Sequence, residues 1–435
     1  MEIRDAEIVI VGAGPIGIEM GLQLQRLNLD FCIVDAGQVG HTIGWYAPGT
    51  HFFSSPERIA IGGIPLITRD QGKATREEYL DYLMTVVWQH DLPVYTLTRL
   101  LSIEESGLVD MTGSESGEKY WRLNLERGGE ERSIRCRFLV LAIGDMHRPR
   151  KLGIPGEEQS NVSHYLRELR NYFRQEVVIV GGRNSAVEAA IRIFRMGGKV
   201  TLLYRGKGLD GKTIKYWLYP EIESMIKNGL IRFIPEATAH QIRGNRLYYS
   251  SPGSSRDVEG TYQAAGDGNQ GSFSHKSPPG KSDSDSPGDE PVRPDAKMQE
   301  LEADQFLLLT GYEQDYSFLE SLGLQLEGAE KRPFFDNNTM ETNLSNVFIA
   351  GTATAGSQQR HTVFIENSHE HVSRIGHTIL GRKPQGDGRS RSDSSAFAIQ
   401  PSPGSGLFPN DIPGEGNEPG SGDALKRIYE EHPES

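Results

Sequence analysis

Three glycines with the spacing G-x-G-x-x-G lie near the start of the chain, between an apolar run and an amphipathic one. They are Gly12, Gly14 and Gly17, within AEIVIVGAGPIGIEM. In this pattern the first glycine permits a tight turn, the second lets the backbone approach a pyrophosphate, and the third allows close packing of helix on strand. The helix start offers amide donors and a positive dipole to phosphates. Asp35 ends the next apolar run, where an acid can hold a ribose hydroxyl. The stretch predicts a dinucleotide site.

A second strand, turn and helix pattern begins at Val177 with VVIVGGRNSAVEAAIRIFRMGGKVTLLYRG. Its turn departs from the fingerprint, because an arginine replaces the glycine of closest approach and an alanine replaces the close-packing glycine. Two polar residues at the helix start add side-chain donors, as capping residues do. The turn comprises Gly181, Gly182, Arg183, Asn184, Ser185 and Ala186. One interpretation is a variant nucleotide loop, and the alternative is a degenerate unit that binds no nucleotide.

The strand that closes this second unit favours the first interpretation. It ends in Tyr204, Arg205 and the nearby Lys207, where a site for NADH would carry an acid. An acid repels a 2′-phosphate, whereas a guanidinium can pair with it bidentately. The first loop therefore suits a cofactor with a free ribose, and the second suits NADPH.

Strand-like apolar runs recur on both sides of the second unit, so the sequence predicts one nucleotide domain interrupted by another. The expected fold is α/β, with two Rossmann-like three-layer dinucleotide-binding domains. The expected boundaries are 1–152 and 304–380 for the two parts of the first domain and 153–303 for the inserted domain. Two stretches rich in Pro, Gly and Ser, 251–297 and 381–435, have too few apolar side chains to fold, and we expect both to be disordered.

Composition narrows the classes of partner and location. The chain of 435 residues has a net charge of −13 and no basic cluster, which argues against nucleic acid and anionic membranes as partners. We expect no membrane span and no metal site. Only two cysteines, Cys32 and Cys136, are present, and both lie in apolar strand patterns. This usage excludes a disulfide framework and favours the cytoplasm.

The order of these segments resembles the thioredoxin reductase family, and the strings HTIGWYAPGTHFFSSPERIAIGGIP, KTIKYWLYPEI and VFIENSHEH resemble its YpdA-like branch of bacillithiol disulfide reductases. The resemblance implies FAD in the first domain and NADPH in the inserted domain. The implied FAD contacts are Gly12, Gly14, Pro15, Ile16, Gly17, Asp35, His41, Thr42, Gly144, Gly351 and Thr352. The implied NADPH contacts are Gly181, Gly182, Arg183, Asn184, Ser185, Tyr204, Arg205 and Lys207.

The route of electrons after the flavin departs from both groups of relatives. Thioredoxin reductases use a Cys-x-x-Cys disulfide, and this chain has none. The YpdA-like branch carries one cysteine in its first glycine loop, where this chain has Ile16. Cys32 and Cys136 are expected in the core, so a protein thiol relay is not expected. His361, beside a segment that the family places near the flavin, is the candidate proton donor, with His369 and His371 weaker candidates.

The sequence thus predicts an enzyme, an FAD-dependent NADPH oxidoreductase that passes electrons to a small disulfide or another small acceptor, either a small molecule or a small protein. It allows a homo-oligomer. Three alternatives stay open: electron transfer like that of ferredoxin–NADP reductases, a flavin monooxygenase, and a non-enzymatic redox sensor that binds NADPH and FAD. An acidic ferredoxin needs a basic docking face, for which the composition gives no support.

Overall fold

The computed structural model describes residues 3–106, 119–251, 298–358 and 362–382. The stretches expected to be disordered lie outside the described residues from position 252 to 297 and from position 383 onward. Two residues assigned to the tail belong instead to the folded part. Gly381 ends helix α7 (His369–Gly381), and Arg382 caps it while pairing with Glu341 at 2.6 Å between Nη1 and Oε1.

The first domain is built on a parallel five-stranded sheet in the order β20-β7-β1-β2-β3. Each strand is short and almost wholly apolar, as expected for parallel strands that are covered on both faces. The strands are β1 (Ile8–Val11), β2 (Phe31–Val34), β3 (Val94–Tyr95), β7 (Phe138–Leu141) and β20 (Val347–Ile349).

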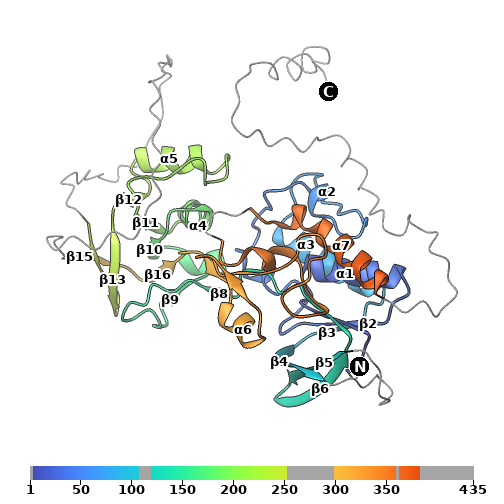
Figure 1. The fold of residues 1–435 in the computed structure, drawn as a ribbon. Helices are drawn as coiled ribbons and strands as arrows, with labels where there is room; N and C mark the ends of the chain where they lie inside the picture. Colours follow the sequence, from blue (N-terminus) through green and yellow to red (C-terminus); the bar gives the residue numbers. More distant parts are fainter. Residues whose placement is uncertain (1–2, 107–118, 252–297, 359–361, 383–435) are drawn as a thin grey trace, which may run out of the picture.

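Helices cover one face of this sheet and an antiparallel sheet covers the other. The helices are α1 (Pro15–Arg26), α3 (Arg76–Gln89) and α7, and Figure 1 shows α1 and α7 side by side. The second layer consists of β4 (Thr98–Ser106), β5 (Tyr120–Arg127) and β6 (Glu130–Cys136). Alternate residues of β1 point to the two cores, because Ile8 and Ile10 pack with the helices while Val9 and Val11 pack with β4–β6.

The second domain repeats this plan with the strand order β12-β11-β10-β16-β9. Its parallel sheet consists of β9 (Val162–Ser163), β10 (Glu176–Val180), β11 (Lys199–Leu203), β12 (Arg232–Ile234) and β16 (Gln305–Leu308). Helices α4 (Asn184–Arg195) and α5 (Tyr219–Lys227) pack on one face. The antiparallel strands β13 (Thr238–Arg243), β14 (Arg246–Ser250) and β15 (Met298–Glu302) pack on the other. The prediction of two Rossmann-like α/β domains is therefore confirmed.

Two chain crossings join the domains, and they are hydrogen-bonded to each other. The outward crossing includes β8 (Arg148–Pro149) and the return crossing includes β17 (Tyr312–Glu313), which pair antiparallel. After β17 the chain forms α6 (Tyr316–Ser321), β18 (Leu326–Glu327) and β19 (Arg332–Pro333) before β20 enters the first sheet. The first sheet thus takes strands from both sides of the second sheet in the sequence, so the second domain is nested in the first (Figure 1).

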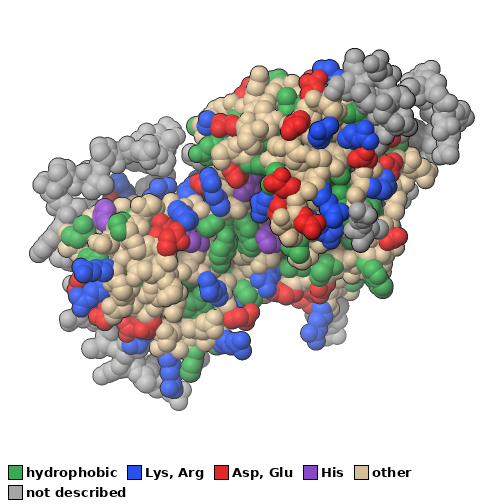
Figure 2. All heavy atoms as spheres, turned by 90° about the horizontal axis from the view of Figure 1, so that it is seen from below, with side chains coloured by type: hydrophobic (Ala, Val, Ile, Leu, Met, Phe, Trp, Pro, Cys, Tyr) green, Lys and Arg blue, Asp and Glu red, His purple; other side chains and the backbone are tan. Residues whose placement is uncertain are grey.

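Charges of both signs are mixed on the face of the molecule that Figure 2 presents, where Lys and Arg side chains are interspersed with Asp and Glu side chains. Within the described ranges, no helix combines the length and the apolar character needed to cross a bilayer.

The hairpin of β14 and β15 generates a prediction about the segment between them. Ser250 lies directly opposite Met298, so residues 252–297 connect two neighbouring positions of one antiparallel pair. Because loop-closure entropy grows slowly with length, replacing residues 252–297 by a short Gly-containing turn should leave the fold intact. We expect the thermal midpoint and NADPH binding of the shortened protein to match those of the full chain. Loss of NADPH binding would show that the segment contributes to the second domain.

Candidate functional site

The first glycine loop has the geometry that a pyrophosphate requires. Gly12 has a φ of +113°, and a Cβ there would lie 2.3 Å from the carbonyl oxygen of Ala142. A Cβ on Gly17 would lie 1.9 Å from the Gly12 carbonyl oxygen, so α1 packs on the turn only because Gly17 has no side chain. Around Gly14, by contrast, a Cβ would meet no atom within 4 Å. Gly14 is the N-cap of α1 and provides no side-chain cap, so the open space faces bare amides that suit a phosphate.

Asp35 fastens this loop to the end of β2. Its Oδ2 accepts a hydrogen bond from the Ala13 N–H at 2.6 Å, and its Oδ1 accepts one from the Gly37 N–H at 2.7 Å. A carboxylate has about four acceptor positions. Asp35 can therefore hold the loop and still accept a ribose hydroxyl, which fits the role expected of it.

Three segments that are far apart in the sequence meet beside the first turn of α1, namely those around Ile16, Gly144 and Gly351. Ile16 is buried in the first turn of α1, and a Cβ on Gly351 would lie 3.4 Å from the Ile16 Cβ. A Cβ on Gly144 would lie 3.8 Å from the Thr352 Oγ1. Gly144 and Gly351 both have positive φ, +75° and +73°, which glycine adopts without strain. The structure thus brings together four of the predicted FAD contacts.

Gln314, which sequence reasoning missed, ties two of these segments together. It is fully buried, and its Nε2 donates to the Gly144 carbonyl at 3.1 Å and to the Ala353 carbonyl at 3.0 Å. Ala353 belongs to the 3₁₀ helix η3 (Gly351–Ala355). Because both amide protons are used, the side-chain orientation of Gln314 is fixed. No motif marks this glutamine, which directly follows the half-buried strand β17 (Tyr312–Glu313).

The two predicted residues after β2 lie beside an aromatic group at the junction of the domains. Thr42 is the N-cap of the 3₁₀ helix η1 (Ile43–Trp45), and the exposed ring of His41 meets Trp45 edge-on at 5.5 Å between centroids. Trp45 also stacks on Tyr312 at 6.3 Å and packs against Tyr165 at 5.8 Å. These aromatic residues were not predicted, because they come from three separate segments that share no local pattern.

The second glycine loop is built like the first, but its open position is filled. Gly181 has a φ of +151°, and a Cβ on Gly182 would lie 2.4 Å from the Tyr204 ring. Arg183 is the N-cap of α4 at the position that corresponds to Gly14, and its side chain is exposed. The structure therefore places an exposed arginine at the position that Gly14 has in the first loop.

The polar residues that follow differ from the expected helix cap. Asn184 and Ser185 lie inside the first turn of α4, and the Asn184 Oδ1 accepts the Lys215 N–H at 2.7 Å. Asn184 thus holds a neighbouring loop. Arg205 and Lys207 are exposed just beyond the end of β11, near this loop.

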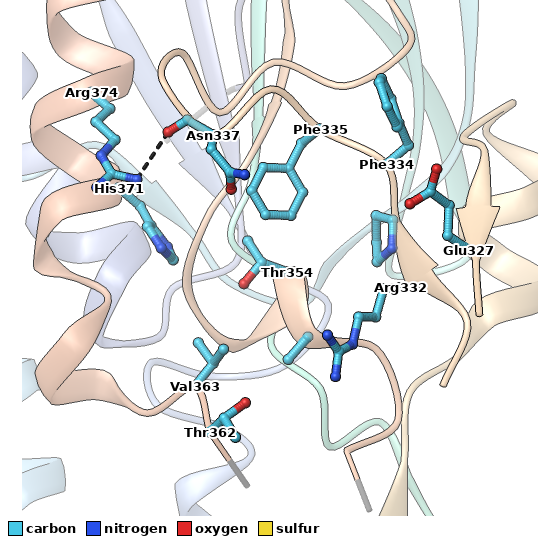
Figure 3. Close-up of a pocket in the computed structure, with 12 residues that line it drawn as sticks. Glu327, Arg332, Phe334, Phe335, Asn337, Thr354, Thr362, Val363, His371 and Arg374 are labelled. Carbon is cyan, nitrogen blue, oxygen red and sulfur yellow. Dashed lines mark hydrogen bonds between the residues drawn. The ribbon is translucent and has the colours of Figure 1, made fainter. Parts of the chain in front are cut away.

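A cavity of about 400 Å³ lies beside η3, and two of the residues that line it, His371 and Thr354, form hydrogen bonds with Gly351 of η3 (Figure 3). The His371 Nδ1 accepts the Gly351 N–H at 3.1 Å, and the Thr354 Oγ1 donates to the Gly351 carbonyl at 2.8 Å. Burial lowers the pKa of His371 to about 4, so its ring is neutral, as an accepting Nδ1 requires. Both peptide groups of Gly351 are thereby fixed from the cavity side. His361, the predicted proton donor, lies outside the described residues.

His369 forms a buried contact with α1 that the sequence did not indicate. Its Nδ1 lies 2.7 Å from the Glu19 Oε2, and its Nε2 lies 3.1 Å from the Arg58 carbonyl oxygen. A carbonyl oxygen only accepts hydrogen bonds, and an ionised carboxylate does the same, so both ring nitrogens must carry protons. Burial alone would lower the pKa of His369, but the contacts with Glu19 and Arg58 outweigh it and raise the pKa. This ion pair holds the start of α7 against α1.

The two cysteines lie in the core of the first domain, as expected. Cys32 is 1% exposed in β2 and Cys136 is fully buried at the end of β6. Burial raises the pKa of Cys32 to about 12 and that of Cys136 well above its ordinary value. Among the described residues, no group of three or more His, Cys, Asp or Glu side chains is arranged to hold a metal ion.

Comparisons with known proteins agree with this architecture. The profile of the family described as "Pyridine nucleotide-disulphide oxidoreductase" matches residues 9–259 and 290–351. Bacilliredoxin reductase Bdr of Bacillus subtilis is 28% identical over 375 residues, which are 86% of this chain and 98% of that protein. The structure of bacillithiol disulfide reductase Bdr (YpdA) from Bacillus cereus is 27% identical, covers 87% of this chain and 100% of its own, and has a TM-score of 0.71.

A more distant structure shares the fold alone. Thioredoxin reductase of T. acidophilum is 16% identical, with 87% of this chain and 100% of that chain covered and a TM-score of 0.59. The expected resemblance to the thioredoxin reductase family and its YpdA-like branch is confirmed.

The Glu19–His369 ion pair predicts a pH-dependent contribution to stability. The folded-state pKa of His369 lies above the ordinary value of 6.5, so the stabilisation is complete below that value and is lost as the pH rises through the folded-state pKa. We expect His369→Gln to lower the free energy of unfolding by about 1.5–3 kcal/mol near pH 6 and by much less near pH 9, measured by denaturant titration.

The exposed His377 of the same helix provides the control. His377→Gln should change the free energy of unfolding little at either pH, because the residue is exposed and its Nδ1 bonds the Ser373 carbonyl of the same helix at 2.8 Å. A loss for His369→Gln that is equal at both pH values would show that the ring contributes only by packing.

Proposed function

The chain belongs to the pyridine nucleotide-disulphide oxidoreductase family and is an oxidoreductase that uses FAD and NAD(P)H. On that premise, we propose that it is an NADPH-dependent reductase of small acceptors and that no protein thiol relays the electrons. The names of its relatives, bacilliredoxin reductase and bacillithiol disulfide reductase, favour a small disulfide or a small redox protein as the acceptor. FAD, when bound, takes the electron pair of NADPH and supplies it to the acceptor.

The observation that carries this proposal is the absence of an available thiol beside the first glycine loop. Ile16 occupies the first turn of α1, where the helix dipole would stabilise a thiolate. Its side chain is packed against Gly351 and can neither attack a disulfide nor form a mixed disulfide. Cys32 and Cys136 are buried, and their raised pKa values disfavour the nucleophilic thiolate. We therefore infer that the acceptor meets the flavin directly.

The groups present at each glycine loop support the assignment of FAD to the first loop and NADPH to the second. The bare amides at Gly14 and the carboxylate of Asp35 suit FAD, which has a free ribose. Arg183 and Arg205 are exposed cations at the second loop, and they suit the additional phosphate of NADPH. The domain boundaries that we propose are those expected from the sequence, 1–152 and 153–303, with the second part of the first domain extended from 304–380 to 304–382. Two free, buried thiols suit a reducing compartment, and we propose the cytoplasm.

Cofactor choice can be tested at Arg205. Removing a charge-assisted bidentate contact typically costs about 1.5–3 kcal/mol, so Arg205→Ala should raise the Michaelis constant for NADPH at least tenfold while that for NADH stays nearly unchanged. Arg243→Ala, which removes an exposed arginine from β13 of the same domain, is the matched control and should change neither constant. Equal losses for NADPH and NADH would contradict the assignment of Arg205.

Direct transfer can be tested by alkylation. We expect the NADPH-reduced wild type to keep its acceptor turnover after iodoacetamide treatment, and the double variant Cys32→Ser, Cys136→Ser to turn over comparably, with some stability lost to two buried hydroxyls. Rapid-mixing measurements of flavin reduction separate that step from acceptor turnover. If alkylation abolishes turnover while flavin reduction survives, one of the two cysteines is the relay.

A further inference from the structure

Five residues from three segments form an aromatic and cationic surface where the two domains meet, which we call the seam platform. They are Phe53, Lys73, Lys215, Tyr216 and Trp217. Phe53 of the first domain stacks on Trp217 of the second at 5.9 Å between ring centroids with an interplanar angle of 18°. Tyr216 meets Trp217 edge-on at 4.8 Å. Phe53 is 59% exposed and Tyr216 is 68% exposed, so the platform presents aromatic rings to solvent.

Two ammonium groups lie over these rings. The Lys73 Nζ is 4.9 Å from the centroid of the Phe53 ring and 5.1 Å from that of Trp217, and the Lys215 Nζ is 5.5 Å from that of Trp217. Lys73 donates to the Phe53 carbonyl, and no described carboxylate forms an ion pair with it. Burial, followed by the charge of Lys215, lowers the pKa of Lys73. The positive charge of Lys73 is thus incompletely compensated.

The acids near the platform are already engaged by other cations. Glu188 accepts from Lys215 at 3.2 Å and from Arg192 at 3.4 Å, so one carboxylate serves two cations. Glu366, which favours the charged form of Lys73, pairs with Arg58 at 3.2 Å. The local balance is therefore positive, in a chain whose net charge is −13.

The platform is joined to the second glycine loop and to the first domain. The backbone N–H of Lys215 donates to Asn184 at the start of α4, and its Nζ donates to the His51 carbonyl at 3.1 Å. Thr50 donates to Glu188 at 2.9 Å from the first-domain side. A molecule on the platform would therefore contact both domains beside the start of α4.

We propose that the seam platform binds the carboxylate-bearing end of a small, aromatic anionic acceptor, with Lys73 pairing to the carboxylate and the exposed Phe53 ring, which Trp217 supports from behind, stacking on its planar group. This inference rests on the proposed reduction of a small acceptor and adds the chemistry by which that acceptor is selected. A protein of net negative charge repels anions at long range, so an incompletely compensated lysine on an aromatic surface provides a local site at which an anion can bind.

The test compares two aromatic disulfides, one dianionic and one neutral, on the FAD-loaded full chain without NADPH. The probes are the dianion 5,5′-dithiobis(2-nitrobenzoate) and the neutral 2,2′-dithiodipyridine, with affinities measured by titration calorimetry. We expect the wild type to bind the dianion about tenfold more tightly than the neutral probe. Lys73→Gln should weaken the dianion about five- to tenfold and leave the neutral probe unchanged, whereas Lys73→Arg should retain the preference. Trp217→Leu should weaken both probes.

Two controls distinguish the platform from a neighbouring surface lysine and from the nucleotide site. Lys212→Gln removes an exposed lysine from the same loop and should leave both affinities unchanged. The affinity for 2′,5′-ADP should be the same in all variants if the platform is distinct from the nucleotide site. The proposal would be overturned if Lys73→Gln and Lys212→Gln weakened binding of the dianion equally, or if the wild type bound both probes with equal affinity. A loss of affinity confined to 2′,5′-ADP would also overturn it. Because binding is measured without turnover, absence of NADPH-driven disulfide reduction would refute the proposed function separately.

Discussion

The first domain depends on the close packing of helix α1 against the glycine turn that precedes it. The backbone amides at the start of α1 have no side-chain cap. Gly17 can lie against the Gly12 carbonyl only without a Cβ, and this contact sets the position of α1 relative to β1. A Cβ on Gly14 would meet no atom within 4 Å, and the helix has no side-chain cap there, so the start of α1 is an open and favourable place for a phosphate. Asp35, Gly144 and Gly351 are arranged around that space from three other strand ends.

The second domain uses the same topology and changes the chemistry at the same point. Arg183 replaces the open position at Gly14, and Tyr204 packs where Gly182 leaves room for its ring. One loop therefore offers space and dipole, whereas the other offers fixed positive charge. The same strand order can thus carry two glycine loops of different chemistry, because the difference lies in a few side chains at the strand ends rather than in the sheets.

The sequence predicted the features that local pattern controls. Glycine spacing located both turns and apolar runs located the strands. The sequence assigned Asp35 to a ribose hydroxyl and did not predict its hydrogen bonds to the Ala13 and Gly37 N–H groups. The structure added features that depend on long-range contact. Gln314 joins Gly144 and Ala353, and Glu19 meets His369 across about 350 residues of chain. No periodicity relates such partners, so only the folded topology can reveal them.

The same limit applies to the domain junction, where Trp45, Tyr165 and Tyr312 come from different segments and form one aromatic group. Two predicted details needed adjustment for a related reason. The Asn184 side chain accepts a hydrogen bond from Lys215, in a loop that folds back onto α4, and does not cap the helix. Arg382 belongs to the folded part because it pairs with Glu341, which is distant in sequence. Local composition identifies neither partner.

The pairing of β8 with β17 has a mechanical consequence. Both covalent connections between the domains run through one antiparallel ribbon, reinforced by the ion pair of Arg148 and Glu313 at 2.6 Å. Such a ribbon resists stretching and sliding, since either would break its ladder, but it twists and bends at low cost. The two connections are therefore tied to each other, so a displacement of one is transmitted to the other. A rotation of one domain against the other would also have to release Trp45 from Tyr312, Thr50 from Glu188 and Phe53 from Trp217.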